Sequence, residues 1–329
     1  MCLSIRGLAV LLVLAAGTAC GREPRDGAVA LAAEPLATFG RSPAGAGHGS
    51  LQLPAHLRLA PDGFVFTLET GHPGAVGFRR GSAQPRVVGR PGRGPGEVAG
   101  PVDMDVSPSG RVWVADQGNA KLVAYQDGAV WKEWLVDHAP MRVVAVGDSQ
   151  VWVGGDLRSS ILVRYDAEGR RLGTAGVPPD TTLRGFRLNQ GSAARGAGPC
   201  AVVWAFRFHS RVDCYGPDGR TVWSVRGPVR IGPDRRTNPY RMQESDRFAY
   251  TDLAVHGGRV YALFMGGPVG QTALRTDRAH VFDVGDGRFL GTLRLPSPAK
   301  ALARSDSLLA LLEYEPEPHI LLYRIREER

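Results

Sequence analysis

The sequence predicts an all-β fold, a six-bladed β-propeller with four antiparallel strands in each blade. Three observations predict it. Short apolar strands separated by Asp-Gly or Glu-Gly turns recur along most of the chain, and a lone N-terminal strand matches the one that the last repeat lacks. An aromatic residue also marks the second strand of successive repeats at spacings of 39 to 57 residues; the markers are Phe66, Trp113, Trp152, Trp204 and Tyr261.

The clearest repeat has expected strands at 102–106, 111–116, 121–125 and 130–136. Further copies begin near residues 56, 142, 253 and 300, and another covers 201–226 with its innermost strand placed near Arg184. Each four-stranded meander has two apolar faces, so it needs a neighbour on both sides. Radial closure supplies those neighbours.

The last repeat stops after three strands, at 300–303, 308–312 and 320–325. Residues 35–40 form an orphan strand of the fourth-strand type. We therefore expect the N-terminal strand to complete the final blade and remove the open edge, which makes residues 35–329 the propeller. One short helix is expected, with Asn238 as its cap and its end at about Phe248.

Residues 1–19 are typical of a signal peptide, with Arg6, the apolar run Leu8 to Ala16, and small residues before Cys20. About nine apolar residues are too few to span a bilayer as a helix. The cleavage site resembles the lipobox of bacterial lipoproteins, which implies a lipid anchor on Cys20. Gly17 stands where that pattern prefers Leu, however, and ordinary signal peptidase would also accept this site. We expect an exported protein tethered to the cell envelope by a flexible segment, residues 20–34.

Removal of the signal peptide leaves Cys200 and Cys214 in an oxidising compartment, where they could pair. A hairpin that turns at His209-Ser210 would place Cys214 opposite Ala205, five residues from Cys200. That offset is too long for a disulfide unless the strand bends or a bulge intervenes. The sequence therefore leaves the disulfide open.

The formal charge is +8, yet only three of the basic residues are lysines and the arginines are scattered along the chain. Nucleic-acid-binding proteins usually gather such residues in a run or a recognition motif. The sequence contains neither. We therefore predict no nucleic-acid partner, and we expect a monomer.

Residues 85–126 contain the connection Gly89 to Val98, then a strand ending at Asp116, then Gly118-Asn119. This arrangement resembles an NHL-type repeat and is similar to bacterial exported six-bladed propellers, many of them lipoproteins. The glycines allow the chain to turn sharply from the rim of one blade to the axis of the next. A phosphate-binding loop is the less favoured interpretation, because the loop opens no helix and lacks a following Lys-Ser/Thr.

Propellers related to this resemblance include hydrolases of lactones and esters and an amidating lyase. A metal-dependent hydrolase needs three or four ligands that converge on the axis. The starts of the innermost strands instead predict a mixed-charge ring around a solvated channel: His56, Asp103, Arg142, Arg184, Asp252 and Lys300. Its cations would repel a metal, so we predict no metal site and no cofactor.

No Gly-x-Ser-x-Gly, His-Glu-x-x-His or Cys-x-x-Cys motif occurs, and no catalytic residue is predicted. The leading functional prediction is therefore a binding module. A metal-dependent hydrolase or lyase acting at the central channel is the alternative.

Loops after the second and fourth strands share one face of a propeller, and here that face carries two long Arg-rich segments, 227–252 and 266–278. We expect an anionic ligand or an acidic protein patch to dock there through bidentate arginine contacts. The residues predicted to bind are Arg235, Arg236 and Arg275 in the loops, together with Arg142 and Lys300 at the channel mouth. The alternative is that the loop arginines are solvated and pair with neighbouring carboxylates.

Overall fold

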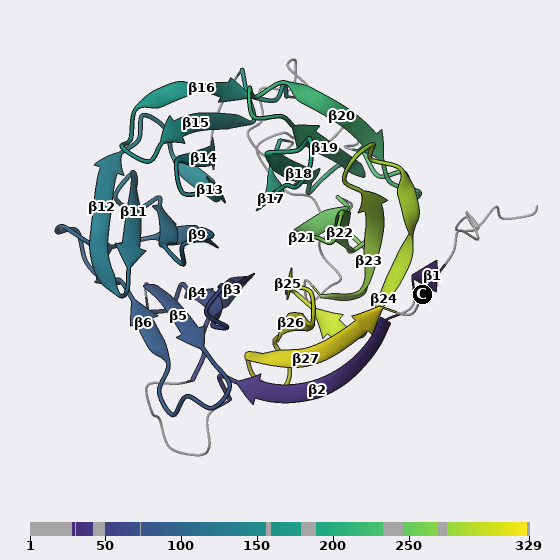
Figure 1. Cartoon of the computed structure of the whole chain (residues 1–329), viewed down its shortest axis with the longest axis horizontal. Coiled ribbons are helices and arrows are strands. Elements are labelled where there is room, and N and C mark those ends of the chain that lie inside the picture. Colours follow the sequence, from purple (N-terminus) through teal and green to yellow (C-terminus); the bar gives the residue numbers. More distant parts are fainter. Residues whose placement is uncertain are drawn as a thin grey trace, which may run out of the picture.

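Six four-stranded antiparallel sheets surround a central axis, which confirms the predicted six-bladed β-propeller (Figure 1). The computed structural model describes residues 28–29, 31–41, 50–72, 74–155, 159–178, 189–232, 246–268 and 275–327. Within these residues there is no helix, and consequently none with the length and apolar character needed to cross a membrane.

The first three blades follow one another along the chain. Blade 1 contains β3 (Pro54–Leu59), β4 (Val65–Glu69), β5 (Gly74–Phe78) and β6 (Arg86–Val88). Blade 2 contains β9 (Pro101–Val106), β10 (Val112–Asp116), β11 (Lys121–Gln126) and β12 (Ala129–Leu135). Blade 3 contains β13 (Pro140–Val146), β14 (Gln150–Gly155), β15 (Leu162–Asp166) and β16 (Arg171–Ala175).

The other three blades complete the ring. Blade 4 contains β17 (Gly191–Arg195), β18 (Val202–Phe206), β19 (Arg211–Tyr215) and β20 (Thr221–Arg226). Blade 5 contains β21 (Tyr250–His256), β22 (Arg259–Phe264), β23 (Thr276–Asp283) and β24 (Phe289–Ala299). Blade 6 contains β25 (Ala301–Arg304), β26 (Leu308–Glu313), β27 (His319–Glu327) and the N-terminal β2 (Leu31–Phe39).

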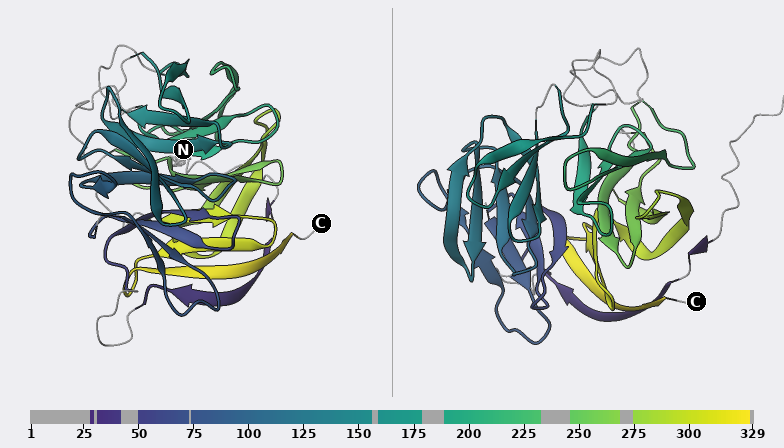
Figure 2. Two further views of the ribbon diagram at one scale, coloured as in Figure 1. Left: turned by 60° about the vertical axis from the view of Figure 1, so that its left-hand side comes forward. Right: turned by 45° about the horizontal axis from the view of Figure 1, so that its top comes forward.

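The N-terminal strand closes the ring as predicted. Strand β2 pairs antiparallel with β27, with Thr38 opposite Leu321, and Figure 2 shows it running along the outer edge of blade 6. It begins at Leu31, inside the segment that the sequence assigned to a flexible tether. Upstream, the two-residue strand β1 (Ala28–Val29) pairs in parallel with β24 of blade 5. The first described residues therefore contact two blades.

The core consists of six large apolar clusters, and each one is shared by two neighbouring blades. The aromatic markers of the repeats lie within these clusters and are at most 3% exposed. Burying such side chains stabilises a fold by about 1.5 to 3 kcal/mol each. Every blade thus depends on both neighbours, which is the physical reason for closure.

The Gly-rich connection between blades 1 and 2 is held by its own carboxylates. Gly94 N–H donates to Glu97 at 2.8 Å, and the Gly100 amide donates to Asp116 at 2.9 Å. Asn119 donates to Asp116 at 2.7 Å and so ties the following turn to the same carboxylate. At Gly92, with φ of 148°, a Cβ would lie 2.0 Å from a Glu97 oxygen. These contacts give the glycines a structural role.

Cys200 and Cys214 form a disulfide, which settles the question that the sequence left open. The hairpin turn is longer than the one assumed, because β18 ends at Phe206 and β19 begins at Arg211. Cys214 therefore lies opposite Val203, and not opposite Ala205. The chain also bends before β18, where Cys200 N–H donates to the Ala197 carbonyl. Together these two features bring the Cα atoms to 5.4 Å.

Two other expectations change in blades 4 and 5. The innermost strand of blade 4 is β17 (Gly191–Arg195), so it starts after Arg184, and Arg184 lies outside the described residues. The expected helix from Asn238 falls mostly outside them as well. Its last part is not helical, because Arg247 forms an isolated β-bridge with Pro268.

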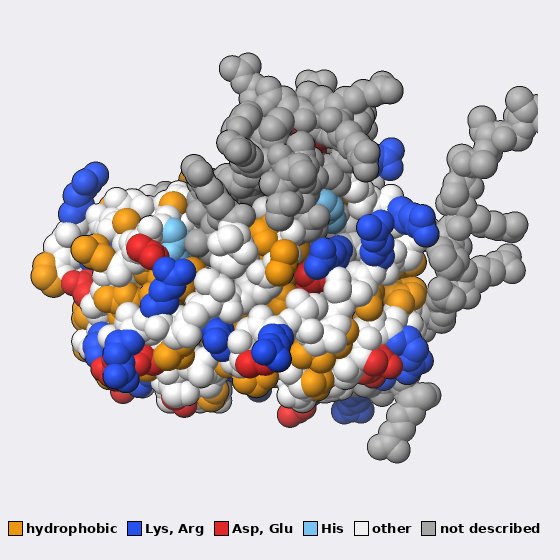
Figure 3. Space-filling model, turned by 90° about the horizontal axis from the view of Figure 1, so that it is seen from above, with side chains coloured by type: hydrophobic (Ala, Val, Ile, Leu, Met, Phe, Trp, Pro, Cys, Tyr) orange, Lys and Arg blue, Asp and Glu red, His pale blue; other side chains and the backbone are white. Residues whose placement is uncertain are grey.

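On the side of the molecule seen in Figure 3, basic and acidic side chains lie among apolar and uncharged ones. Several exposed arginines are paired locally; examples are Arg170 with Asp166 at 2.7 Å and Arg294 with Asp277 at 2.6 Å. Exposed pairs of this kind contribute little to stability. Each such pair compensates the charge of its own arginine.

Candidate functional site

A pocket of about 350 Å³ opens at the axis, where the innermost strands begin and the second strands end. It lies on the face that the sequence predicted for binding. Trp204, Phe248 and Ile161 supply apolar walls. The charged or titratable lining residues come from five blades: His56, Arg142, Arg207, Asp252 and Lys300. Both its size and its mixed lining are typical of a small-molecule site.

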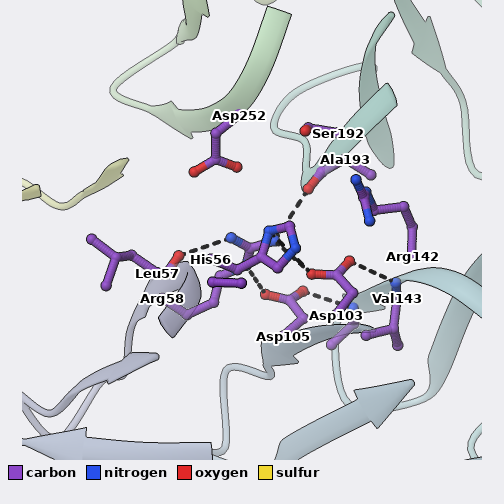
Figure 4. A network of polar contacts seen from close by, with 12 residues as sticks. His56, Leu57, Arg58, Asp103, Asp105, Arg142, Val143, Ser192, Ala193 and Asp252 are labelled. Carbon is purple, nitrogen blue, oxygen red and sulfur yellow. Dashed lines mark hydrogen bonds and ion pairs between the residues drawn. The ribbon is translucent and has the colours of Figure 1, made fainter. Parts of the chain in front are cut away.

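Beneath the pocket, carboxylates of β9 join three blades (Figure 4). Asp105 accepts from Arg58 Nε at 2.9 Å and from the Ala145 amide at 2.8 Å. Asp103 accepts from the Val143 amide at 3.0 Å. Because side chains two residues apart on a strand share a face, Asp103 and Asp105 both point to the axis. The result is a buried ionic network under the pocket floor.

His56 sits at a bulge in β3 with an unusual positive φ of 58°. Bulges re-aim side chains, and here the imidazole Nδ1 lies 3.5 Å from Asp103 Oδ1 (Figure 4). Its side chain is 12% exposed and borders the pocket. Burial, and then the charges of Arg142, Arg58, Arg207 and Lys300, hold the pKa of His56 well below 6.5. The imidazole is therefore neutral near pH 7.

Asp252 is the acidic wall of the pocket. It is 1% exposed, and its Oδ2 accepts from the Leu302 amide at 3.0 Å. Its Oδ1 is buried without a hydrogen-bond partner. Burial raises the pKa of Asp252 to about 6, with Arg58 partly opposing the rise. This carboxyl thus titrates near neutral pH.

Three cations line the same pocket as Asp252. Arg142 donates to the carbonyls of Gly191 at 2.7 Å and Met141 at 2.6 Å, which fixes its guanidinium. Lys300 donates to Tyr314 at 2.9 Å, and burial and the charge of Arg207 lower its pKa. Burial and the charge of Arg142 lower the pKa of Arg207 to about 10, and its Nε is buried without a partner. The cations therefore repel one another in a poorly solvated space.

The structure brings together several of the residues predicted from the sequence. His56, Arg142, Asp252 and Lys300 line the pocket, and Asp103 lies beneath it. Arg275 is not among the lining residues and pairs with Glu315 at 2.7 Å on the surface. The remaining predicted residues, Arg184, Arg235, Arg236 and the lipidation site Cys20, lie outside the described residues.

The sequence predicted a ring of charged side chains around a solvated channel. That prediction is wrong for the two acidic residues of the ring, Asp103 and Asp252. Asp103 is 0% exposed and Asp252 is 1% exposed, because the ends of the innermost strands crowd the axis. Where the chain is described, no group of three or more His, Cys, Asp or Glu side chains is arranged to hold a metal ion. Hydrogen bonds to amides and to Arg58 occupy most of the carboxylate oxygens instead.

Sequence reasoning missed Arg58, Asp105, Arg207 and Trp204 as site residues. The alternation of side chains along a strand was a usable signal for Arg58 and Asp105, which lie two residues after His56 and Asp103. Arg207 follows directly after β18, a position that lines the pocket in this fold. Trp204 was recognised only as a repeat marker.

The fold and this site define a six-bladed β-propeller with a charged axial pocket. No family model matches the chain, and no curated protein matches it in sequence. Solved structures do match its fold. Virginiamycin B lyase from Staphylococcus aureus, in a catalytically inactive variant with quinupristin, has a TM-score of 0.54 at 10% identity. The match covers 82% of this chain and 80% of that one.

A second match is the Cps50 (Swd1) β-propeller domain of Myceliophteria thermophila. Its TM-score is 0.51 at 12% identity, and the match covers 89% of this chain and 99% of that domain. At such identities the likeness shows the propeller fold alone.

Proposed function

We propose that this protein is an exported, lipid-anchored binding protein whose axial pocket takes a small ligand with an anionic group. One observation carries the proposal: Arg142, Arg207 and Lys300 converge from three blades on one pocket. Burial and mutual repulsion lower the pKa of Arg207 and Lys300. An anion would relieve that repulsion and accept hydrogen bonds from these cations.

The charge balance around the pocket supports an anionic ligand. The cations Arg58, Arg142, Arg207 and Lys300 face the carboxylates Asp103, Asp105 and Asp252. Because the pKa of Asp252 is about 6, part of its negative charge is lost just below neutral pH. A carboxylate from a ligand would place a fourth negative charge beside these four cations.

The location is proposed from the sequence and from the disulfide. The segment before Cys20 resembles a lipoprotein leader, and the Cys200–Cys214 bridge suits an oxidising compartment. We further propose that the chain is related to NHL-repeat propellers, because of its Gly-rich connection and the turn that follows Asp116.

Metabolic labelling with a radioactive fatty acid tests the lipid anchor on Cys20. Wild type should be labelled and membrane-bound, whereas Cys20→Ala should be unlabelled; equal labelling of both contradicts the anchor.

Calorimetry with matched probes tests the binding site. We expect small carboxylates such as 3-phenylpropionate to bind at least about 10-fold more tightly than their neutral amides, since charged hydrogen bonds contribute about 1.5 to 3 kcal/mol. Arg207→Gln and Lys300→Gln should each remove most of this preference. Arg220→Gln is the control, because the Arg220 side chain is 90% exposed. Equal binding of acids and amides by the wild type overturns the proposal.

Catalysis at the axis is the second candidate function. The observation that favours it is His56, which is neutral near pH 7, lies 3.5 Å from Asp103 and borders the pocket. Among the fold neighbours is a lyase, although that activity belongs to the neighbour. A lactone and ester panel, run with metal analysis of the purified protein, separates the two functions. Turnover that disappears in His56→Gln would favour the enzyme; its absence favours binding.

A further inference from the structure

Unpaired polar atoms of two neighbouring blades at the pocket have opposite hydrogen-bonding needs. On blade 5, Asp252 Oδ1 is an acceptor that is buried without a partner. On blade 4, Arg207 Nε and Trp204 Nε1 are donors in the same condition. All three residues line the pocket. Buried polar groups in native proteins are almost always hydrogen-bonded, so whatever fills the pocket is expected to offer both a donor and an acceptor.

The acidic side requires a donor that is preferably charged. Asp252 is 1% exposed, and only its Oδ2 is occupied, by the Leu302 amide. Arg58, the cation with the largest effect on Asp252, is engaged by Asp105 at 2.9 Å. A ligand ammonium group would give Asp252 Oδ1 the charged hydrogen-bond donor that it lacks.

The basic side requires an acceptor. Trp204 is held rigidly, because a Cβ on Gly191 would lie 2.4 Å from its Nε1 and one on Gly154 would lie 3.1 Å from its ring. Its indole N–H is therefore fixed in direction. Together with Arg207 and Lys300 it forms a set of donors suited to a carboxylate. Phe248, Ile161 and Met141 offer apolar surface in the same pocket.

We propose that the ligand is a small zwitterion with an apolar side chain, such as an amino acid or a dipeptide with both termini free. Its ammonium group binds Asp252, and its carboxylate binds Arg207, Lys300 and the Trp204 indole. The apolar side chain packs on Phe248 and Ile161. The cavity of about 350 Å³ lies near the lower end of the range for small-molecule sites, which suits a ligand of this size. This inference rests on the proposed anion-binding function and refines it.

The direction of the pH dependence separates a zwitterion from a simple anion. Arg58, Asp103 and Arg207 are the charged groups coupled to Asp252, whose pKa is about 6. As pH falls through 6, Asp252 loses its charge and with it the attraction for an ammonium group. Affinity for a zwitterion therefore decreases on acidification. Affinity for a carboxylate without an ammonium group stays constant or increases, because a neighbouring negative charge has been removed.

The test is calorimetry on the mature protein with L-phenylalanine, L-leucine, L-methionine and L-tryptophan, each beside its N-acetyl and amide derivatives. At pH 7.5 we expect at least one free amino acid to bind at least about 10-fold more tightly than both blocked forms, and to weaken at pH 5. N-acetyl forms that bind as well as free amino acids overturn the zwitterion but leave the anion site intact. A panel in which no carboxylate binds overturns both proposals.

Variants give an independent readout. Asp252→Asn removes the charge and retains an acceptor for the Leu302 amide, so it should lower zwitterion affinity at least about 10-fold and spare 3-phenylpropionate. Asp127→Asn is the matched control, because Asp127 lies in an exposed turn with φ of 53° that asparagine accepts. If Asp252→Asn leaves zwitterion affinity unchanged, the assignment of Asp252 is wrong. The wild-type pH profile tests the same assignment without any variant.

Discussion

The Asp252 carboxylate of blade 5 accepts a hydrogen bond from the Leu302 amide of blade 6 at 3.0 Å. Asp103 makes the same contact between blades 2 and 3, to the amide of Val143 at 3.0 Å. Inward-facing acids thus join neighbouring innermost strands at two separate blade boundaries. The second oxygen of each carboxylate is buried without a hydrogen-bond partner, but Asp103 Oδ1 lies 3.5 Å from His56 Nδ1 and 3.9 Å from Arg58. Asp252 differs in that it lines the pocket. It therefore combines a structural contact with an unused acceptor at the pocket.

Asp252 should make the stability of the protein depend on pH. Its pKa is about 6 in the folded state against an ordinary value of 3.8, so folding takes up a proton between these values. Wild type should lose stability relative to Asp252→Asn as pH rises from about 4 to 7, by about 3 kcal/mol, and the difference should be constant above pH 7. Urea unfolding of both proteins across this range measures it. If the difference in unfolding free energy between the two proteins does not change from pH 4 to pH 7, the raised pKa of Asp252 is contradicted.

Asp105 is expected to be the most sensitive carboxylate of the axial network. Asp105→Ala removes the partner of Arg58, whose side chain is only 12% exposed, and leaves the Ala145 amide unpaired. Breaking a buried ion pair in this way costs about 3 to 5 kcal/mol. Urea denaturation should show the loss directly. Glu34→Ala, which removes an exposed partner of Arg324, should change stability by less than about 1 kcal/mol.

The disulfide should stabilise blade 4. Cys200 and Cys214 are 14 residues apart in the sequence, and closing a loop of this length stabilises a fold by about 3 kcal/mol in the chain-entropy model. A Cys200→Ala and Cys214→Ala double variant should unfold at lower denaturant concentration than oxidised wild type. A reducing agent should destabilise wild type and leave the double variant unaffected. An unchanged wild-type midpoint under reduction argues against this role.

The N-terminal strand should be required for a closed ring. In blade 6, Phe39 stacks on Phe78 of blade 1 with ring centroids 5.6 Å apart, and β2 covers the edge of β27. A protein that starts at residue 51 exposes that edge and should aggregate or lose cooperative unfolding. A protein that starts at residue 31 retains β2 and serves as the control. Light scattering and thermal unfolding compare them; identical behaviour would show that closure does not need β2.

The repeat pattern in the sequence was enough to place most strands. The aromatic residue that marks the second strand of each repeat lies in a cluster between two blades. Asp-Gly turns such as Asp127-Gly128 adopt the left-handed conformations that an Asp-Gly dipeptide favours. Blade 4 was less predictable, since its innermost strand, Gly191–Arg195, has small residues and no long apolar run. The disulfide was left open because its geometry depends on the length of the β18–β19 turn.

By itself, the sequence determined the number of blades and the strand that closes them. Alternating apolar residues and turn residues act over short distances along the chain, and those are the interactions that a linear pattern records. Only the tertiary structure decided that Arg207, Trp204 and Asp252 border one pocket, or that Arg275 pairs elsewhere. Those relationships depend on bulges, loop lengths and burial at the axis. Residues far apart in the chain meet there and shift one another's pKa.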